Sequence, residues 1–195
     1  MKKIFCVLLL SCFTITGFVY AQNNKFEKAV EVNGGVGLDD RVEYTFGLNF
    51  VGGYRLNDMF LIGGGLGYSY INGLYYTSFG PGVYHDYDSY DIRNNLNLFA
   101  RIKMNFTNTA ISPFLSIDLG GTIGMSSNST KMANGFLFEP AFGCDFSINE
   151  MQKLYLMIGY KGMQYQYHIF DYYDLDNYYN KGMAGVFCVQ IGFTF

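Results

Sequence analysis

Apolar and polar residues alternate with a period of two along most of the chain after residue 27, as in β-strands that have one apolar face. The clearest stretch is the last, residues 183–195, which reads MAGVFCVQIGFTF. Its alternate apolar positions are Phe187, Val189, Ile191, Phe193 and Phe195. The residues between them are smaller or more polar. Because the chain ends on this stretch, we expect it to be the closing strand of a sheet rather than a link to another domain.

Seven earlier stretches alternate in the same way, each about as long as a tilted membrane strand of 9–11 residues or slightly longer. They cover residues 28–38, 42–56, 59–72, 94–106, 113–125, 135–148 and 154–167. The connections after the second, fourth and sixth are short. Those after the third, fifth and seventh are long, and two of them, 73–93 and 168–182, are rich in tyrosine and aspartate. Short turns at one end and long loops at the other are typical of outer-membrane barrels with both termini in the periplasm.

The first 21 residues have the features of a cleavable export signal. Lys2 and Lys3 form a positive start, an apolar run follows, and Val19-Tyr20-Ala21 has a small residue at its end. We therefore expect cleavage between Ala21 and Gln22, with residues 22–195 forming one barrel domain. The mature chain would carry 11 basic and 16 acidic side chains, since the full chain has 13 and 16. This net charge of −5 disfavours nucleic acid as a partner.

Two kinds of eight-stranded barrel fit an exported chain of this length, a soluble calyx and a membrane barrel. Half of all residues are hydrophobic and 19% are aromatic, yet after the signal no run approaches the ~18 apolar residues of a membrane helix. One face of each stretch is almost continuously apolar, which suits lipid. The other face mixes Gly, Ser, Thr and Asn with scattered charges. The pattern therefore favours an all-β, eight-stranded, antiparallel up-and-down transmembrane barrel with a filled polar lumen.

The polar faces place charges of both signs inside this barrel. By parity the inward residues are Glu31, Glu43, Asp118, Glu139, Asp145, Arg55, Arg101, Lys103 and Lys161. If the hairpin turns are centred as the pattern suggests, Arg101 lies opposite Asp118 and Glu139 lies opposite Lys161, close enough to form ion pairs. Cys188 also faces inward, whereas Cys144 faces lipid, so we expect no disulfide between them.

The whole mature chain resembles the small outer-membrane barrels of the OmpA-transmembrane and OmpX-like group. The resemblance rests on the eight-strand architecture and on the C-terminal strand, whose residues Phe187 to Phe195 are similar to the assembly signal of these proteins. It implies a location in the outer membrane of a Gram-negative bacterium. It also implies contact with membrane lipid and lipopolysaccharide, and with the barrel assembly machinery during insertion.

Candidate catalytic and metal-binding residues are few. Both histidines, His85 and His168, lie in expected outer loops, near Ser78 and Ser89, but no motif joins them into a catalytic set. The acidic run Asp171, Asp174 and Asp176 lacks the glycine and terminal glutamate of an EF-hand loop. The glycine run at residues 63–67 is explained by space in a barrel strand rather than by phosphate binding. We therefore expect no enzyme activity, no cofactor and no metal.

Three functions remain open from the sequence. The first is a structural or surface-interaction barrel that meets an extracellular partner through its tyrosine- and aspartate-rich outer loops, Tyr75–Tyr90 and His168–Tyr179. Tyrosine offers a large contact area with few rotatable bonds, as in many binding surfaces. The second is a small channel or transport component, and the third is a lipid-modifying barrel enzyme.

Overall fold

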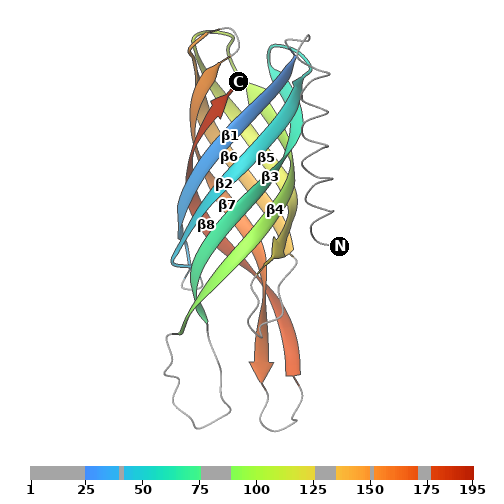
Figure 1. The fold of residues 1–195 in the computed structure, drawn as a ribbon, viewed down its shortest axis with the longest axis vertical. Helices are drawn as coiled ribbons and strands as arrows, with labels where there is room; N and C mark the ends of the chain where they lie inside the picture. The colour runs from blue at the N-terminus through green and yellow to red at the C-terminus, as the bar shows by residue number, and fades with distance from the viewer. Residues whose placement is uncertain (1–24, 40–41, 76–88, 126–134, 150–151, 171–176) are drawn as a thin grey trace, which may run out of the picture.

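The alternating stretches form eight antiparallel strands, and each pairs with its neighbours along the chain. β1 also pairs with β8, so the sheet closes into a barrel (Figure 1). This is seen in a computed structural model, which describes residues 25–39, 42–75, 89–125, 135–149, 152–170 and 177–195. The expected fold class is therefore confirmed. The strands are β1 (Phe26–Gly37), β2 (Tyr44–Arg55), β3 (Phe60–Tyr75), β4 (Ser89–Asn105), β5 (Ile111–Gly124), β6 (Gly135–Ser147), β7 (Lys153–Phe170) and β8 (Asn177–Thr194).

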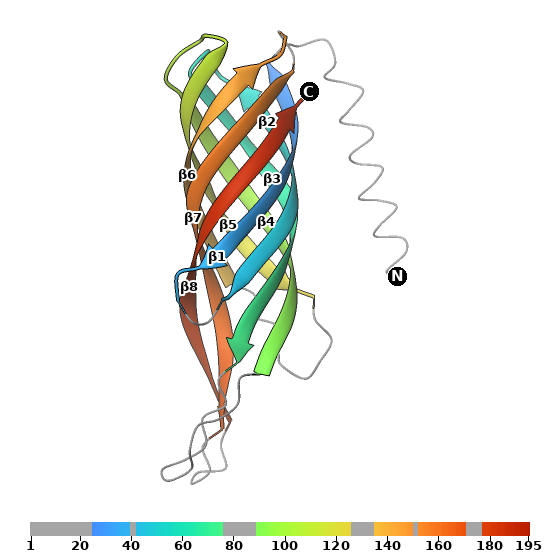
Figure 2. The same cartoon turned by 90° about the vertical axis from the view of Figure 1, so that its left-hand side faces the viewer.

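The two ends of the barrel differ. At one end, the short-turn end, β2 leads into β3, β4 into β5 and β6 into β7 within a few residues, and β1 begins beside the end of β8. At the other end, the long-loop end, the β3–β4 and β7–β8 hairpins continue past the rest of the wall (Figures 1 and 2). By the outer-membrane rule, we expect the short-turn end to face the periplasm.

The two long hairpins correct the expected loop bounds. Residues 73–93 and 168–182 were expected to be loops, but β3 runs on to Tyr75, β4 starts at Ser89, β7 ends at Phe170 and β8 starts at Asn177. The period-two pattern fades there because water lies on both faces of a strand that leaves the membrane, so neither face needs to be apolar.

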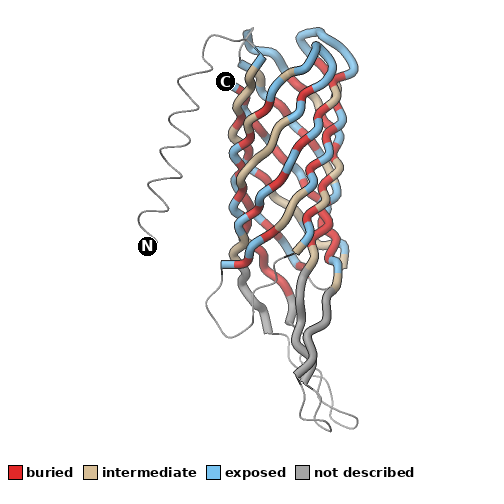
Figure 3. The backbone as a smooth tube through the Cα atoms, turned by 90° about the vertical axis from the view of Figure 1, so that its right-hand side faces the viewer, coloured by how far each residue is buried: buried red, intermediate tan, exposed pale blue. Residues whose placement is uncertain are grey.

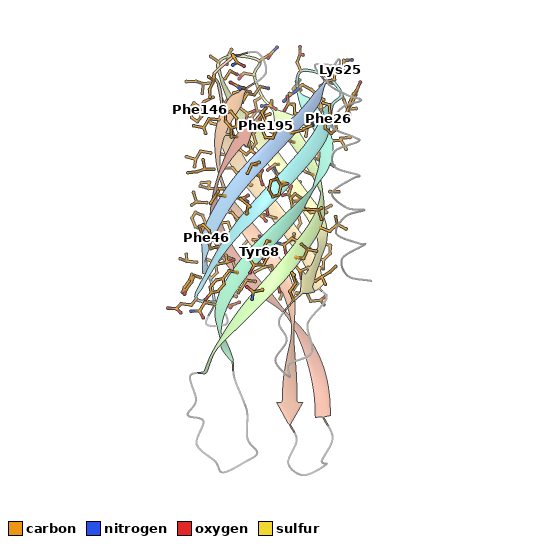
Figure 4. The ribbon with its side chains drawn as sticks, in the orientation of Figure 1. Lys25, Phe26, Phe46, Tyr68, Phe146 and Phe195 are labelled. Atoms are coloured by element: carbon orange, nitrogen blue, oxygen red, sulfur yellow. The ribbon has the colours of Figure 1, made fainter. Side chains whose placement is uncertain are left out.

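Burial alternates along the strands as the parity predicts (Figure 3). The outward side chains are large and apolar, and they form a continuous belt around the barrel; Figure 4 shows them from Phe146 and Phe195 near the short-turn end to Phe46 and Tyr68 towards the long-loop end. The outward side chains near the end of β8 include Phe187, Val189, Ile191 and Phe193, and Phe195 follows the strand directly; these five are the residues of the expected assembly signal. The inward side chains are mostly polar and almost inaccessible. The molecule thus has an apolar exterior and a polar core.

Tyrosines flank the apolar belt. Tyr44 and Tyr70 stack with ring centroids 6.3 Å apart near the long-loop end, and the Tyr68 hydroxyl donates to Asn94 Oδ1 at 2.6 Å. Tyr54 lies outside the barrel near the short-turn end of β2. Tyrosines in these positions match the aromatic girdles that membrane barrels place at the lipid–water interfaces.

Two residues at the long-loop end differ from expectation. Val42 was expected on the lipid face of the second strand, but it precedes β2 and is buried. Glu43 was expected in the lumen, yet it is exposed, and its carboxylate accepts a hydrogen bond of 2.8 Å from Asn72 Nδ2. Both differences have one cause. The ladder between β1 and β2 ends at the Val36–Tyr44 pair, so strand parity no longer applies to residues before Tyr44.

Candidate functional site

The lumen is the one place in the described part of the barrel where charged side chains are gathered and buried together, so it is the site to test for function. Its buried polar residues come from all eight strands, and include Glu31, Asn33, Thr45, Asn49, Ser69, Asn97, Arg101, Lys103, Asn105, Ser112, Ser116, Asp118, Thr122, Glu139, Asp145, Lys161, Gln190 and Thr194.

Arg101 is the centre of the first cluster. It faces Asp118 across the β4–β5 hairpin, as the register predicted, and its Nε and Nη2 donate to the two carboxylate oxygens at 2.7 Å each. Its other edge donates to Glu31 of β1 through Nη1 and, at 3.2 Å, through Nη2. Glu31 also accepts hydrogen bonds from Asn49 Nδ2 at 3.0 Å and from Tyr155 Oη at 2.5 Å. One guanidinium therefore holds two fully buried carboxylates.

Lys103 is the centre of the second cluster. Its Nζ lies 2.6 Å from Asp145 Oδ1, and Asn105 Nδ2 donates to the other oxygen of Asp145 at 2.8 Å. The ammonium also lies over two aromatic rings, 3.9 Å from the centroid of Phe114 and 4.8 Å from that of Tyr155. The carboxylate of Asp145 and the faces of the two rings together offset the free-energy cost of removing the lysine ammonium from water.

The third cluster contains the second expected pair. Lys161 Nζ lies 3.4 Å from Glu139 Oε2, and Gln190 Nε2 of β8 donates to Glu139 Oε1. Glu139 is also the cross-strand neighbour of Asp118 on β5, so the first and third clusters adjoin. All four residues of the expected lumen ion pairs are thus buried inside the barrel.

A fourth group closes the short-turn end. Glu27 Oε1 lies 2.6 Å from Arg55 Nε and 3.3 Å from Lys153 Nζ. Sequence reasoning did not single out Glu27, because the alternation was read from Lys28 onward, although its parity matches Glu31. Among the described side chains, the lumen then holds five carboxylates and five cations. The charges of these described side chains therefore balance one another.

Glycines make room for the largest lumen side chains. Phe99, Phe114 and Tyr155 each have a glycine as cross-strand neighbour, namely Gly65, Gly143 and Gly192. A Cβ added at these glycines would fall 2.5, 2.6 and 2.1 Å from atoms of the respective rings. A barrel of eight strands has space only for its own side chains. The lumen is therefore a core filled by the barrel's own side chains, most of them polar.

No catalytic or metal-binding set emerges from the described residues. They contain no group of three metal-ligating side chains, and Cys144 and Cys188 are both free thiols. Several residues that the sequence singled out lie outside the described residues, namely Ala21, Gln22, Ser78, His85, Asp171, Asp174 and Asp176. The side chains of Ser89 and His168 lie outside them as well. No helix among the residues described is long and apolar enough to cross a membrane.

A closed eight-stranded barrel with an apolar belt outside and paired charges inside is the structure of a small integral outer-membrane barrel. The closed form leaves no strand edge unpaired in lipid, and the protein is located in the outer membrane. No protein-family model matches the chain, and no curated protein matches it.

Solved structures carry the comparison further. The chain is similar to the outer membrane protein OprG from Pseudomonas aeruginosa, with a TM-score of 0.59, 14% identity, and coverage of 87% of this chain and 94% of that one. Neisserial surface protein A matches with a TM-score of 0.47, 13% identity and coverage of 87% and 96%. The N-terminal barrel domain of Pseudomonas aeruginosa OprF matches with a TM-score of 0.44 and 16% identity, and the match covers 87% of this chain and 97% of that one. The likeness to OprG shows the fold.

Proposed function

We propose that the protein is a structural barrel of the outer membrane that displays its two long hairpins to a partner outside the cell. The observation that carries this proposal is the length of the β7–β8 hairpin. Pairing between β7 and β8 continues to Phe170–Asn177, whereas β6 leaves β7 after Met163 and β1 leaves β8 after Val186. Seven residues beyond Met163 correspond to roughly 20 Å of two-stranded ribbon.

A ribbon of this kind suits recognition. Beyond the wall, no described strand of the barrel pairs with either outer edge of the hairpin, and strand edges of this kind can pair with another chain. The β3–β4 hairpin repeats the arrangement on a smaller scale, with pairing to Tyr75–Ser89. The tyrosine- and aspartate-rich sequences of residues 75–90 and 168–179 lie on these hairpins, and we assign the contact with the extracellular partner to them.

The packed lumen counts against the channel as an alternative. Glu31, Arg101 and Asp118 join β1, β4 and β5 in one ion-paired cluster, and each is at most 3% exposed. Moving an ion past this cluster would require breaking buried charge pairs, which is costly. We expect planar-bilayer recordings of the purified protein to show no discrete conductance steps. Regular steps at low voltage would favour the channel instead.

The interaction proposal is tested by shortening the hairpins without touching the barrel. One variant replaces residues 165–182 with Asn-Gly between the paired Gln164 and Met183, and a second replaces residues 74–90 with Asn-Gly between the paired Gly73 and Asp91. The control shortens residues 126–134, the connection from β5 to β6. We expect all three to insert and to show heat-modifiable migration. When each variant is expressed in a deletion strain, only the control should restore the wild-type phenotype. Full restoration by the two hairpin variants would refute the proposal.

A further inference from the structure

Two side chains of β7 cross over β8 inside the barrel and reach β1. Tyr155 Oη donates to Glu31 Oε1 at 2.5 Å, and Lys153 Nζ lies 3.3 Å from Glu27 Oε1. β8 lies between the partners in both cases, because it pairs with β7 on one side and with β1 on the other. The contacts therefore span the seam at which the first and last strands of the barrel meet.

Gly192 leaves the path for the first of these contacts. It is the cross-strand neighbour of Tyr155 on one side and of Glu31 on the other. A Cβ at Gly192 would lie 2.1 Å from Tyr155 Cζ and 2.4 Å from its hydroxyl oxygen. The tyrosine ring therefore lies across the bare backbone of β8, and any side chain at this position would displace it.

The charges of the lumen give β1 a distinct part in closure. The other strands contribute five cations and three carboxylates to the described lumen, and β1 adds the remaining two carboxylates, Glu27 and Glu31. Without β1 the described lumen has an excess of two positive charges. With β1 in place it is neutral. Because opposite charges attract more strongly where water is excluded, neutralisation favours β1 in its closed position.

We propose that Glu27 and Glu31 form a latch that holds the β1–β8 seam closed from inside the barrel. The other seven strand pairs are also joined by a chain connection, whereas β1 and β8 are held only by their backbone ladder and by side chains. The latch bonds exist only after β1 has met β8, so they act on the one seam that can open without unfolding a hairpin. Through Glu31, the same event completes the Arg101 cluster.

The first test removes a single hydroxyl. Tyr155→Phe keeps the ring over Gly192 and leaves Glu31 bonded to Arg101, but it deletes the link from β7. Hydrogen bonds to charged groups are among the stronger ones, so we expect this variant to unfold about tenfold faster at a fixed temperature in detergent. The rate is measured as the loss of the folded, faster-migrating band on SDS gels run without boiling the sample. Tyr160→Phe, on the lipid face of the same strand, is the matched control and should leave the rate unchanged. Equal rates for Tyr155→Phe and the wild type would overturn the latch.

The second test separates an effect on the seam from a general loss of lumen stability. In a Cys144→Ala/Cys188→Ala background, cysteines at the paired lipid-facing positions Val32 and Ile191 join β1 to β8 by a disulfide. With this disulfide formed, Tyr155→Phe should change the unfolding rate by less than about twofold.

The control for this test is a disulfide elsewhere in the wall. Cysteines at the paired positions Ile102 and Ile117 join β4 to β5, and there the tenfold effect of Tyr155→Phe should persist. If the effect is equally large with either disulfide, Tyr155 stabilises the lumen but does not latch the seam.

A third variant tests the second bond. Lys153→Met removes the partner of Glu27 on β7 and leaves Arg55 in place, so the unfolding rate should rise, and the Val32–Ile191 disulfide should suppress this rise as well. Because Glu27 and Lys153 are partly exposed, their ion pair is weakened by solvent, and the expected rise is smaller than for Tyr155→Phe. Lys28→Met, outside the barrel on β1, is the control. A rise that survives the seam disulfide would exclude Lys153 from the latch.

Discussion

Lys103 of β4 and Asp145 of β6 form an ion pair at 2.6 Å although β5 lies between their strands. The two side chains can meet across β5 because this strand has a small residue opposite each of them. Ser116 lies opposite Lys103, and Ser112 lies opposite Asp145. The lysine side chain passes over β5 and rests on the ring of Phe114. A contact of this kind ties three strands together where a hairpin pair ties two.

This pair predicts that losing one partner costs more than losing both. Asp145→Asn leaves the Lys103 ammonium buried without its counter-charge, and breaking such a pair costs about 3–5 kcal/mol of unfolding free energy. Adding Lys103→Met, an uncharged side chain of similar length that still packs on Phe114, should recover much of that loss. Urea unfolding in lipid vesicles measures both variants. A double variant less stable than Asp145→Asn alone would contradict the expectation.

Glycines on the two faces of the wall should respond oppositely to alanine. Gly192→Ala places a methyl group against the ring of Tyr155 in the filled lumen, and overpacking of this kind costs about 1–3 kcal/mol. Gly34→Ala places it on the lipid face, where the nearest atom lies at 3.9 Å. Alanine restricts the unfolded chain more than glycine does, so Gly34→Ala should leave the free energy of unfolding unchanged or raise it slightly. Thermal unfolding of the two variants decides the matter, and a stable Gly192→Ala protein would show that the lumen has spare room.

Pro140 interrupts the ladder between β6 and β7. The paired residues run from Leu137–Met163 and Phe138–Gly162 directly to Ala141–Gly159, and Glu139 and Pro140 are left out. Even-numbered residues of β6 point their N–H towards β7, as the bond from Ile148 N to Gln152 O indicates, and proline has none to offer. Pro140→Val should restore the donor and stabilise the barrel by about 0.5–1.5 kcal/mol.

Hydrogen exchange provides the readout for Pro140→Val. We expect slower exchange of neighbouring β6 and β7 amides in the variant, with no change in the distant β2–β3 ladder. Unchanged protection near residue 140 would mean that the ladder is weak there for a reason other than the missing N–H.

The last strand should be required for insertion. Phe193 and Phe195 lie on the lipid face and stack with ring centroids 6.3 Å apart. From the resemblance of this strand to the assembly signal, we expect the assembly machinery to recognise these rings. Replacing both with serine should leave the protein in the periplasm or degraded, as measured by fractionation. Phe106→Ser, exposed at the short-turn end near β4, should insert normally. Normal insertion of the Phe193/Phe195 variant would refute the assembly signal.

Strand positions and the facing of side chains could be predicted from the sequence because the membrane imposes them. Lipid outside and side chains inside force a period of two, and short turns then set which residues meet within a hairpin. For this reason Arg101 and Asp118 could be paired in advance. The pattern ended where the membrane ends, so the length of the β3–β4 and β7–β8 hairpins could not be read from it.

Contacts across the barrel needed the closed structure. Parity shows that Glu31 and Arg101 both face inward, but it does not show where they lie around the wall or at what height. These depend on the tilt and stagger of all eight strands together. Glu27 could have been found by extending the parity of Glu31 backwards by four residues, since a charged residue on an inward position signals a partner inside.

The division between an apolar exterior and a paired interior also sets how freely the chain can diverge. An outward position requires only that its side chain dissolve in hydrocarbon, so Leu, Ile, Val and Phe can replace one another there at little cost. An inward position must match a partner of opposite charge or a glycine that leaves it room. Substitutions should therefore accumulate along alternate residues of each strand. The barrel shape that this chain has in common with OprG at 14% sequence identity fits this expectation.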